Sequence, residues 1–183
     1  VYGASGFGKE VMPLVRQQFA TLKKEQFVFI DDGKAGTNLN CYSVLSYHDF
    51  SSKIDSSKAV CIAIANSQVR EKLTERLHQD QVQLLSIAAQ NVIVQDEVEL
   101  AEGSLLCSFV CLTSNIKIGK CFHANLYSYV AHDCIIGDYV TFAPGVKCNG
   151  NIHIEDHAYI GTGALLQQGT PDKPLVIGKG AIV

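Results

Sequence analysis

Residues 112–142, LTSNIKIGKCFHANLYSYVAHDCIIGDYVTF, carry an apolar residue at every sixth position. The same spacing extends over residues 94–166, and all of its positions are apolar: Val94, Leu100, Leu106, Leu112, Ile118, Ala124, Val130, Ile136, Phe142, Cys148, Ile154, Ile160 and Leu166. A second series of apolar or small residues follows four positions after each member of the first, from Val98 to Thr170. A helix period of 3.6 residues or a strand period of 2 does not produce this phase.

A six-residue repeat predicts a left-handed parallel β-helix, in which each hexapeptide forms one short strand and one corner. Three hexapeptides make a triangular coil, and the repeated apolar side chain points into the prism, where the next coil buries it. Gly119, Gly137 and Gly161 follow apolar isoleucines of the series, and they predict corners with an unusual backbone angle or tight clearance. After Leu166 the repeat is interrupted by residues 167–174, whose two prolines and glycine predict a loop extruded from a corner.

Residues 1–86 have a different pattern, in which apolar runs alternate with amphipathic helical segments. The glycine-rich loop GASGFG at residues 3–8 opens one helix, and the apolar runs 27–30 and 59–65 predict two strands. This order predicts a small Rossmann-like α/β domain over residues 1–86, followed by the β-helix over residues 87–183. The sequence begins at the end of a strand and stops within a hexapeptide, so we expect incomplete termini, above all at the C-terminus.

The composition argues against several classes of protein. The net charge is −3 and no cluster of Lys or Arg occurs, so we expect no nucleic acid partner. No uncharged stretch has the length of a membrane span, and the first residues show no signal peptide. The seven cysteines form no CxxC pair, which favours reduced thiols, a cytoplasmic location and no metal site.

Three motifs occur in order along the chain: YGASGFG at residues 2–8, FIDD at residues 29–32 and VAHDCIIGD at residues 130–138. Together with the hexapeptide series, they resemble the bacterial sugar O-/N-acyltransferase family of hexapeptide-repeat transferases. That family includes sialic acid O-acetyltransferase-like proteins and N-acetyltransferases of nucleotide-linked 4-amino-6-deoxy sugars. The resemblance extends over essentially the whole chain, and it implies acetyl-CoA as cosubstrate and a role in surface polysaccharide biosynthesis.

Acyl transfer from a thioester requires a base near the acceptor, and histidine is the usual base near neutral pH. His132 follows an inward-pointing residue by two positions, so we expect its side chain on the outside of a coil. The adjacent Asp133 can fix the tautomer of an imidazole through a hydrogen bond. A surface histidine beside an unrelated aspartate is the alternative, but the surrounding motif favours His132 as the catalytic base with Asp133 as its partner.

The resemblance also implies contacts to the two substrates. It places Thr141, Gly150 and Thr162 along the coenzyme, with the Gly150 N–H stabilising the thioester oxyanion, and it places Asn125 near the sugar. In the trimer that the family implies, His132 is expected in a cleft between subunits, with the coenzyme running along the coils of the neighbouring subunit past Gly150 and Thr162. In the first domain, a glycine-rich turn that opens a helix offers backbone N–H groups to a phosphate.

The resemblance assigns the pyrophosphate of a sugar nucleotide to Ser5, Gly6 and Phe7. Asp31 and Asp32, at the end of the next strand, are then expected to bind the nucleoside. The alternative is a tight strand-to-helix turn and a solvated acidic loop.

The sequence therefore predicts an N-acetyltransferase that moves acetyl from acetyl-CoA to the amine of a UDP- or dTDP-linked 4-amino-4,6-dideoxy sugar. Direct attack is expected because Cys134 lies on an inward series and cannot act as the nucleophile. O-acetylation of sialic acid or another glycan sugar is one alternative, and a non-catalytic nucleotide-sugar-binding protein is a second. Outward aromatic residues near the predicted site, Phe109, Tyr127 and Tyr129, favour an interface, and the family implies a homotrimer.

Overall fold

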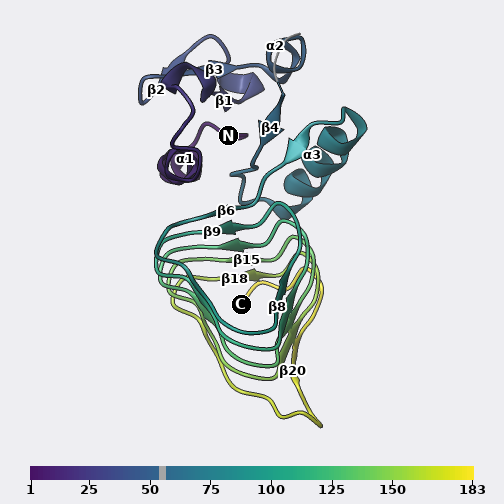
Figure 1. Ribbon diagram of the computed structural model, residues 1–183. Coiled ribbons are helices and arrows are strands. Elements are labelled where there is room, and N and C mark those ends of the chain that lie inside the picture. Colours follow the sequence, from purple (N-terminus) through teal and green to yellow (C-terminus); the bar gives the residue numbers. More distant parts are fainter. Residues whose placement is uncertain (54–56) are drawn as a thin grey trace. The chain divides into compact units, whose positions relative to one another are not determined.

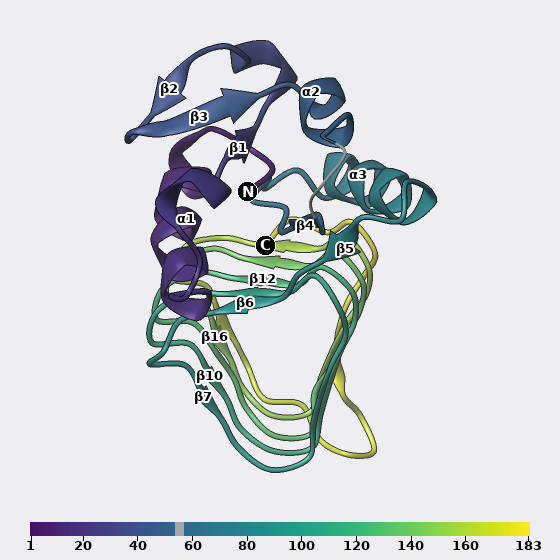
Figure 2. The same cartoon turned by 45° about the horizontal axis from the view of Figure 1, so that its top comes forward.

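The second part of the chain winds into stacked triangular coils (Figures 1 and 2). The computed structural model describes residues 1–53 and 57–183, which form two units, Val1–Leu85 and Ser86–Val183. In the second unit, three sheets of five short parallel strands make the three faces of a prism. This arrangement confirms the predicted left-handed parallel β-helix.

Each face collects every third strand. The first face contains β6 (Ile87–Ala88), β9 (Leu105–Leu106), β12 (His123–Ala124), β15 (Thr141–Phe142) and β18 (Tyr159–Ile160). The second face contains β7 (Ile93–Val94), β10 (Cys111–Leu112), β13 (Tyr129–Val130), β16 (Lys147–Cys148) and β19 (Leu165–Leu166). The third face contains β8 (Val98–Leu100), β11 (Ile116–Ile118), β14 (Ile135–Ile136), β17 (Ile152–Ile154) and β20 (Leu175–Ile177). We call the edges between faces one and two, two and three, and three and one the first, second and third corners.

The repeated apolar residues form the core of the prism, as predicted. From Leu106 to Leu166 every member of the six-residue series is no more than 4% exposed. Val94 and Leu100 are exceptions, at 52% and 38% exposed, and the expectation that the whole series is buried was wrong there. Both belong to the first complete set of strands, which has a following coil on one side only. In this terminal coil, no preceding coil within the described residues covers the apolar side chains, so they stay partly exposed.

The corners use left-handed backbone at residues other than the predicted glycines. At the second corner, Glu97, Asn115, Asp133 and Asn151 all have φ between 55° and 59°. Gly137 instead provides clearance, since a Cβ there would lie 2.5 Å from Asp156 Oδ1 and 2.7 Å from the Asp156 backbone nitrogen. Of the two reasons predicted for the corner glycines, tight clearance is the one that applies at Gly137.

The interruption after Leu166 is an extruded loop at the second corner, as predicted (Figure 1). Thr170 and Lys173 exchange backbone hydrogen bonds of 3.0 and 3.1 Å, which closes the loop as a short hairpin. The Gly169 N–H donates to the Gly150 carbonyl at 3.0 Å, so the base of the loop continues the stacking of the corner.

The first unit is a small α/β domain, also as predicted. Its sheet is mostly parallel, with β1 paired to β3, β4 paired to β5, and Tyr2 bridging Ile30 and Ile62 between these pairs, while β2 joins β3 antiparallel. The strands are β1 (Phe29–Ile30), β2 (Asn38–Leu39), β3 (Tyr42–Leu45), β4 (Ala59–Val60) and β5 (Gln83–Leu84). The helices are α1 (Gly6–Gln18), α2 (Tyr47–Ser51) and α3 (Ser67–Gln79), with short 3₁₀ turns at Lys24–Gln26 and Asp32–Lys34.

Helix α3 buries a charged residue, Arg70, on the same side as its apolar Leu77. Val69 is 40% exposed, whereas Arg70 is fully buried. The Arg70 guanidinium donates to the carbonyls of Ile64 and Ala65 at 3.0 Å each, so hydrogen bonds to the turn before the helix compensate its burial. In the described ranges, no helix combines the length and the apolar character that a membrane crossing requires.

Candidate active site

His132 and Asp133 lie together at the second corner, between β13 and β14. His132 Nδ1 is 2.7 Å from Asp133 Oδ2, and both side chains are about half exposed, at 49% and 47%. A carboxylate accepts only from a protonated nitrogen, so Nδ1 carries the proton and the neutral ring has its lone pair at Nε2. Nε2 has no hydrogen-bond partner within the described residues. The ring is therefore arranged to accept a proton from outside the corner.

Asp133 is held by the coil before it as well as by His132. Asn115 stands one coil earlier, and its Nδ2 donates to Asp133 Oδ1 at 3.2 Å. The hydrogen bond from His132, followed by that from Asn115, lowers the pKa of the Asp133 carboxyl below its usual value. Asp133 has a φ of 59°, in the left-handed region that Asp and Asn tolerate better than most residues. Aspartate at position 133 thus satisfies both requirements, the left-handed backbone of the corner and a carboxylate for the imidazole.

Gly150 lies directly against the His132 imidazole. A Cβ at this position would be 2.5 Å from His132 Cε1 and 2.6 Å from Nε2, so only glycine fits without moving the ring. The Asn151 N–H donates to the His132 carbonyl at 3.0 Å, which ties the two coils together beside the ring. In the described part of the chain, the Gly150 N–H has no acceptor.

The other residues predicted for the coenzyme and the sugar do not gather at the second corner. Asn125 is at the first corner, where its Nδ2 donates to the Phe142 carbonyl at 2.8 Å. Thr162 is exposed at the same corner, near the end of the prism that β18 forms. Thr141 is in β15 on the first face and is only 3% exposed in the single chain. His132, Asp133 and Gly150 are therefore the part of the prediction that one corner brings together.

The glycine loop of the first unit is shaped by close backbone approach. Gly3 has a φ of +108°, and a Cβ on Gly8 would lie 2.0 Å from the Gly3 carbonyl oxygen. Ser5 is the N-cap of α1, but its side chain makes no capping hydrogen bond, and Ser5 and Gly6 are exposed while Phe7 is half-buried. The first turn of α1 has no acidic residue. An uncapped helix N-terminus of this kind favours an anion.

Asp31 and Asp32 hold the loops around this helix N-terminus. Asp31 accepts from the Ala4 N–H through Oδ2 and from the Gly33 N–H through Oδ1, both at 3.1 Å. Asp32 Oδ1 accepts from the Tyr47 N–H at 2.7 Å, at the start of α2. These carboxylates therefore have structural partners that the sequence did not indicate, and Asp31 links the glycine loop to the end of β1.

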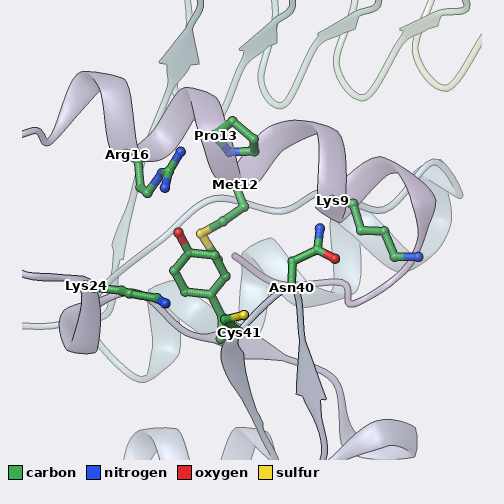
Figure 3. A pocket seen from close by; sticks show the side chains of 8 residues that line it. Lys9, Met12, Pro13, Arg16, Lys24, Asn40 and Cys41 are labelled. Carbon is green, nitrogen blue, oxygen red and sulfur yellow. The ribbon is translucent and has the colours of Figure 1, made fainter.

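A basic pocket of about 300 Å³ lies along the flank of α1 (Figure 3). Its lining includes the cations Lys9, Arg16 and Lys24, together with Tyr42, over whose ring Lys24 Nζ lies at 5.7 Å from the centroid. None of the residues predicted to bind the nucleotide contributes to this lining. The pocket therefore adds positive charge beside α1 without including the glycine loop.

The cysteines of the second unit near this corner are not placed for nucleophilic chemistry. Cys134 and Cys148 are fully buried, and the Cys134 thiol donates to the Asn149 carbonyl at 3.2 Å. A hydrogen bond with Cys134, together with burial, raises the pKa of the Cys148 thiol. Across the described residues, no cluster of three His, Cys, Asp or Glu side chains is arranged to hold a metal ion.

Comparison with known proteins adds to this geometry. Residues 1–77 match the PglD N-terminal domain family. Over 98% of its length the chain is 44% identical to a GDP-perosamine N-acetyltransferase of Escherichia coli O157:H7, of which it covers 82%. The structure of WeeI from Acinetobacter baumannii AYE is 76% identical with a TM-score of 0.98, and the match covers 99% of this chain and 85% of WeeI.

A more distant structure shares the fold. It is a mutant of perosamine N-acetyltransferase from Caulobacter crescentus in complex with CoA and GDP-perosamine, with 16% identity and a TM-score of 0.76. The match covers 97% of this chain and 89% of that protein.

The contact between Gly150 and the imidazole yields a first prediction. In Gly150→Ala the new methyl group displaces the His132 ring and breaks its hydrogen bond to Asp133. The free energy of unfolding changes by less than about 1 kcal/mol, because a half-exposed ring can rotate outward. Nitrogen NMR of the imidazole detects the change as loss of the tautomer protonated at Nδ1.

Gly178→Ala is the control, since a Cβ there meets only Glu155 Oε2 at 3.9 Å. An unchanged tautomer in Gly150→Ala would contradict the packing of His132 on Gly150.

Proposed function

The chain belongs to the sugar N-acyltransferases of the hexapeptide-repeat type, and we propose that it acetylates the amine of a nucleotide-linked 4-amino-4,6-dideoxy sugar with acetyl-CoA as donor. The observation that carries the proposal is the His132–Asp133 pair packed on Gly150 at one corner of the β-helix. The E. coli relative, named for N-acetylation of a nucleotide-linked sugar, supports the reaction. The CoA complex of the Caulobacter protein supports the same donor on the same fold.

The residues at the second corner can stabilise the negative charge that develops in the reaction and can transfer its proton. The sugar amine attacks the acetyl carbonyl carbon, a C–N bond forms, and the negative charge that develops on the carbonyl oxygen is stabilised by the Gly150 N–H. His132 Nε2 removes a proton from the attacking nitrogen, while Asp133 stabilises the imidazolium. The C–S bond then breaks, and the proton passes to the CoA thiolate. The products are the N-acetylated sugar and CoA.

The first unit is proposed to bind the nucleotide. The uncapped α1 N-terminus at Ser5, Gly6 and Phe7 suits the pyrophosphate. Asp31 contacts the glycine loop through the Ala4 N–H, and we propose that Asp31 and Asp32 bind the nucleoside. O-acetylation of sialic acid leaves this anion site without a nucleotide, so it is the weaker alternative. All seven cysteines are free thiols, which supports a location in the cytoplasm, and cell fractionation tests it.

Replacement of His132 tests the assignment of the base. His132→Ala is expected to lower kcat by about 10²- to 10⁴-fold at saturating amino sugar, measured as release of free CoA thiol. Because hydrogen bonds lower the pKa of Asp133, this carboxylate stays ionised between about pH 5 and 8. The charge of Asp133 should therefore stay constant over this pH range.

Asp133→Asn keeps a residue that tolerates the left-handed corner but removes the charge. It should lower kcat by about 10²-fold or more. A near-full rate in His132→Ala would overturn the assignment of the base.

The identity of the nucleotide is tested by thermal stability. The family resemblance favours UDP or dTDP, whereas the E. coli relative is named for a GDP-linked sugar. A ligand at 100 times its Kd stabilises the native state by about 2.7 kcal/mol. When UDP, dTDP and GDP are tested in parallel at the same concentration, the nucleotide that binds most tightly should therefore give the largest rise in Tm. Ser5→Pro or Gly6→Pro, which alter the helix N-terminus, should reduce the rise, and no rise at millimolar nucleotide argues against a nucleotide-linked substrate.

We further propose a homotrimer. Large apolar side chains are exposed at the first corner, Phe109, Leu126 and Tyr127, and on the two end strands β7 and β19 of the second face, Ile93 and Leu165. The rings of Phe109 and Tyr127 stack at 4.9 Å yet are 53% and 64% exposed. Aromatic surface of this kind is typical of an interface core.

Sedimentation of the wild-type protein should give three times the monomer mass, and Phe109→Ser with Tyr127→Ser should dissociate it. Val176→Ser, at a position 55% exposed on the third face, is the control. A wild-type protein that is active as a monomer contradicts the trimer.

A further inference from the structure

Asn149 is the residue before Gly150 at the second corner, and Tyr129 fixes its side chain. Tyr129 belongs to β13 on the second face, one coil earlier, and its hydroxyl donates to Asn149 Oδ1 at 2.7 Å. Both side chains are half-buried. Tyr129 and His132 belong to one coil, and Asn149 and Gly150 belong to the next. The Tyr129–Asn149 hydrogen bond therefore joins the same two coils as the contact of His132 with Gly150.

The hydrogen bond from Tyr129 determines the orientation of the Asn149 amide. The phenol occupies the carbonyl oxygen, so the NH₂ group is directed away from the ring of Tyr129. Within the described residues, this NH₂ has no hydrogen-bond partner, and it is not enclosed, so solvent reaches it. It is a donor held in one orientation and open to a ligand.

The backbone of the same residue orients a second donor. The Asn149 carbonyl accepts from Cys134 Sγ at 3.2 Å and from Cys148 Sγ at 3.8 Å, and both thiols are buried in the core of the prism. The C=O and N–H of a trans peptide point in opposite directions, and no described peptide bond is cis. The Gly150 N–H therefore points out of the prism, at the corner where the His132 ring lies.

We infer that Asn149 supplies a second donor to the oxyanion, through its side-chain NH₂ and beside the Gly150 N–H. The inference rests on the proposed acetyl transfer. As the amine attacks, the acetyl carbonyl oxygen becomes negative, and oxyanion sites commonly combine a backbone N–H with an Asn or Gln amide. Asn149 is then a catalytic residue, and Tyr129 is a positioning residue that acts through it.

Asn149→Ala is the main test. It should lower kcat by about 10²- to 10³-fold, while the KM for acetyl-CoA changes by less than about 3-fold, because the lost interaction forms only in the transition state. Asn149→Asp places a carboxylate where the NH₂ stood, so it should lower kcat at least as much.

Asn91→Ala is the matched control. Asn91 is an asparagine of the first corner whose Oδ1 also accepts a hydrogen bond, from the Phe109 N–H at 3.4 Å. It should keep the wild-type kcat.

Tyr129→Phe tests the positioning role, since it removes only the hydroxyl. It should lower kcat by about 10-fold, the order expected for one hydrogen bond, and the double variant Tyr129→Phe with Asn149→Ala should lose no more than Asn149→Ala alone. Losses that multiply in the double variant would show that Tyr129 acts independently of Asn149. If Tyr129 and Asn149 had only a structural role, both single variants would lower Tm, and the kcat of the double variant would not equal that of Asn149→Ala.

The outcomes separate this inference from the proposed function. Wild-type turnover with a near-full kcat in Asn149→Ala overturns the oxyanion role alone. A wild-type protein that releases no CoA with any nucleotide-linked amino sugar overturns the proposed function and this inference with it.

Discussion

Consecutive coils of the β-helix pair in parallel with an offset of 18 residues, except across the extruded loop between β17 and β20, and this register determines both the core and the site. Inside the prism it stacks the apolar series into one continuous core. At the corners it places each residue beside the one 18 positions away, which brings Asn115 to Asp133 and His132 to Gly150. A shift of the register by one residue would turn the apolar side chains outward and would also separate these pairs. Stability and chemistry therefore depend on the same pairing.

The corner conformation restricts which residues can build such a site. At the second corner a left-handed φ recurs at Glu97, Asn115, Asp133 and Asn151, and three of these four are Asn or Asp, which tolerate it best, although Phe109 and Tyr127 adopt it at the first corner. At Asp133 the tolerated residue also carries the carboxylate that the His132 ring needs. Glycine has a different function at Gly150, where the side-chain space is taken by the imidazole. The short rigid corner thus fixes a base, its partner and a free N–H without a long loop.

Much of this was predictable from the sequence, and the exceptions have physical reasons. The six-residue series predicts the β-helix because burial in a stacked coil imposes that period, and the adjacency of His132 and Asp133 is local. The burial of Arg70 in α3 was missed because hydrogen bonds to carbonyls of the preceding turn override its polarity. The Ala4–Asp31 and Tyr129–Asn149 hydrogen bonds join residues 27 and 20 positions apart. Such pairs follow from the folded register, which a linear pattern does not display.

The division of the chain into two units separates the chemistry from the choice of acceptor. His132, Gly150 and Asn149 all belong to one corner of the β-helix, where the core holds their backbone. The anion site that we propose at the start of α1 belongs to the other unit, in a loop shaped by Gly3 and Asp31. On this proposal, substitutions in that loop change which nucleotide is bound while the proposed base and oxyanion donors stay in place. The proposed assignment draws binding energy for the nucleotide and stabilisation of the transition state from different residues, so it predicts that one reaction centre can be kept while the sugar nucleotide changes.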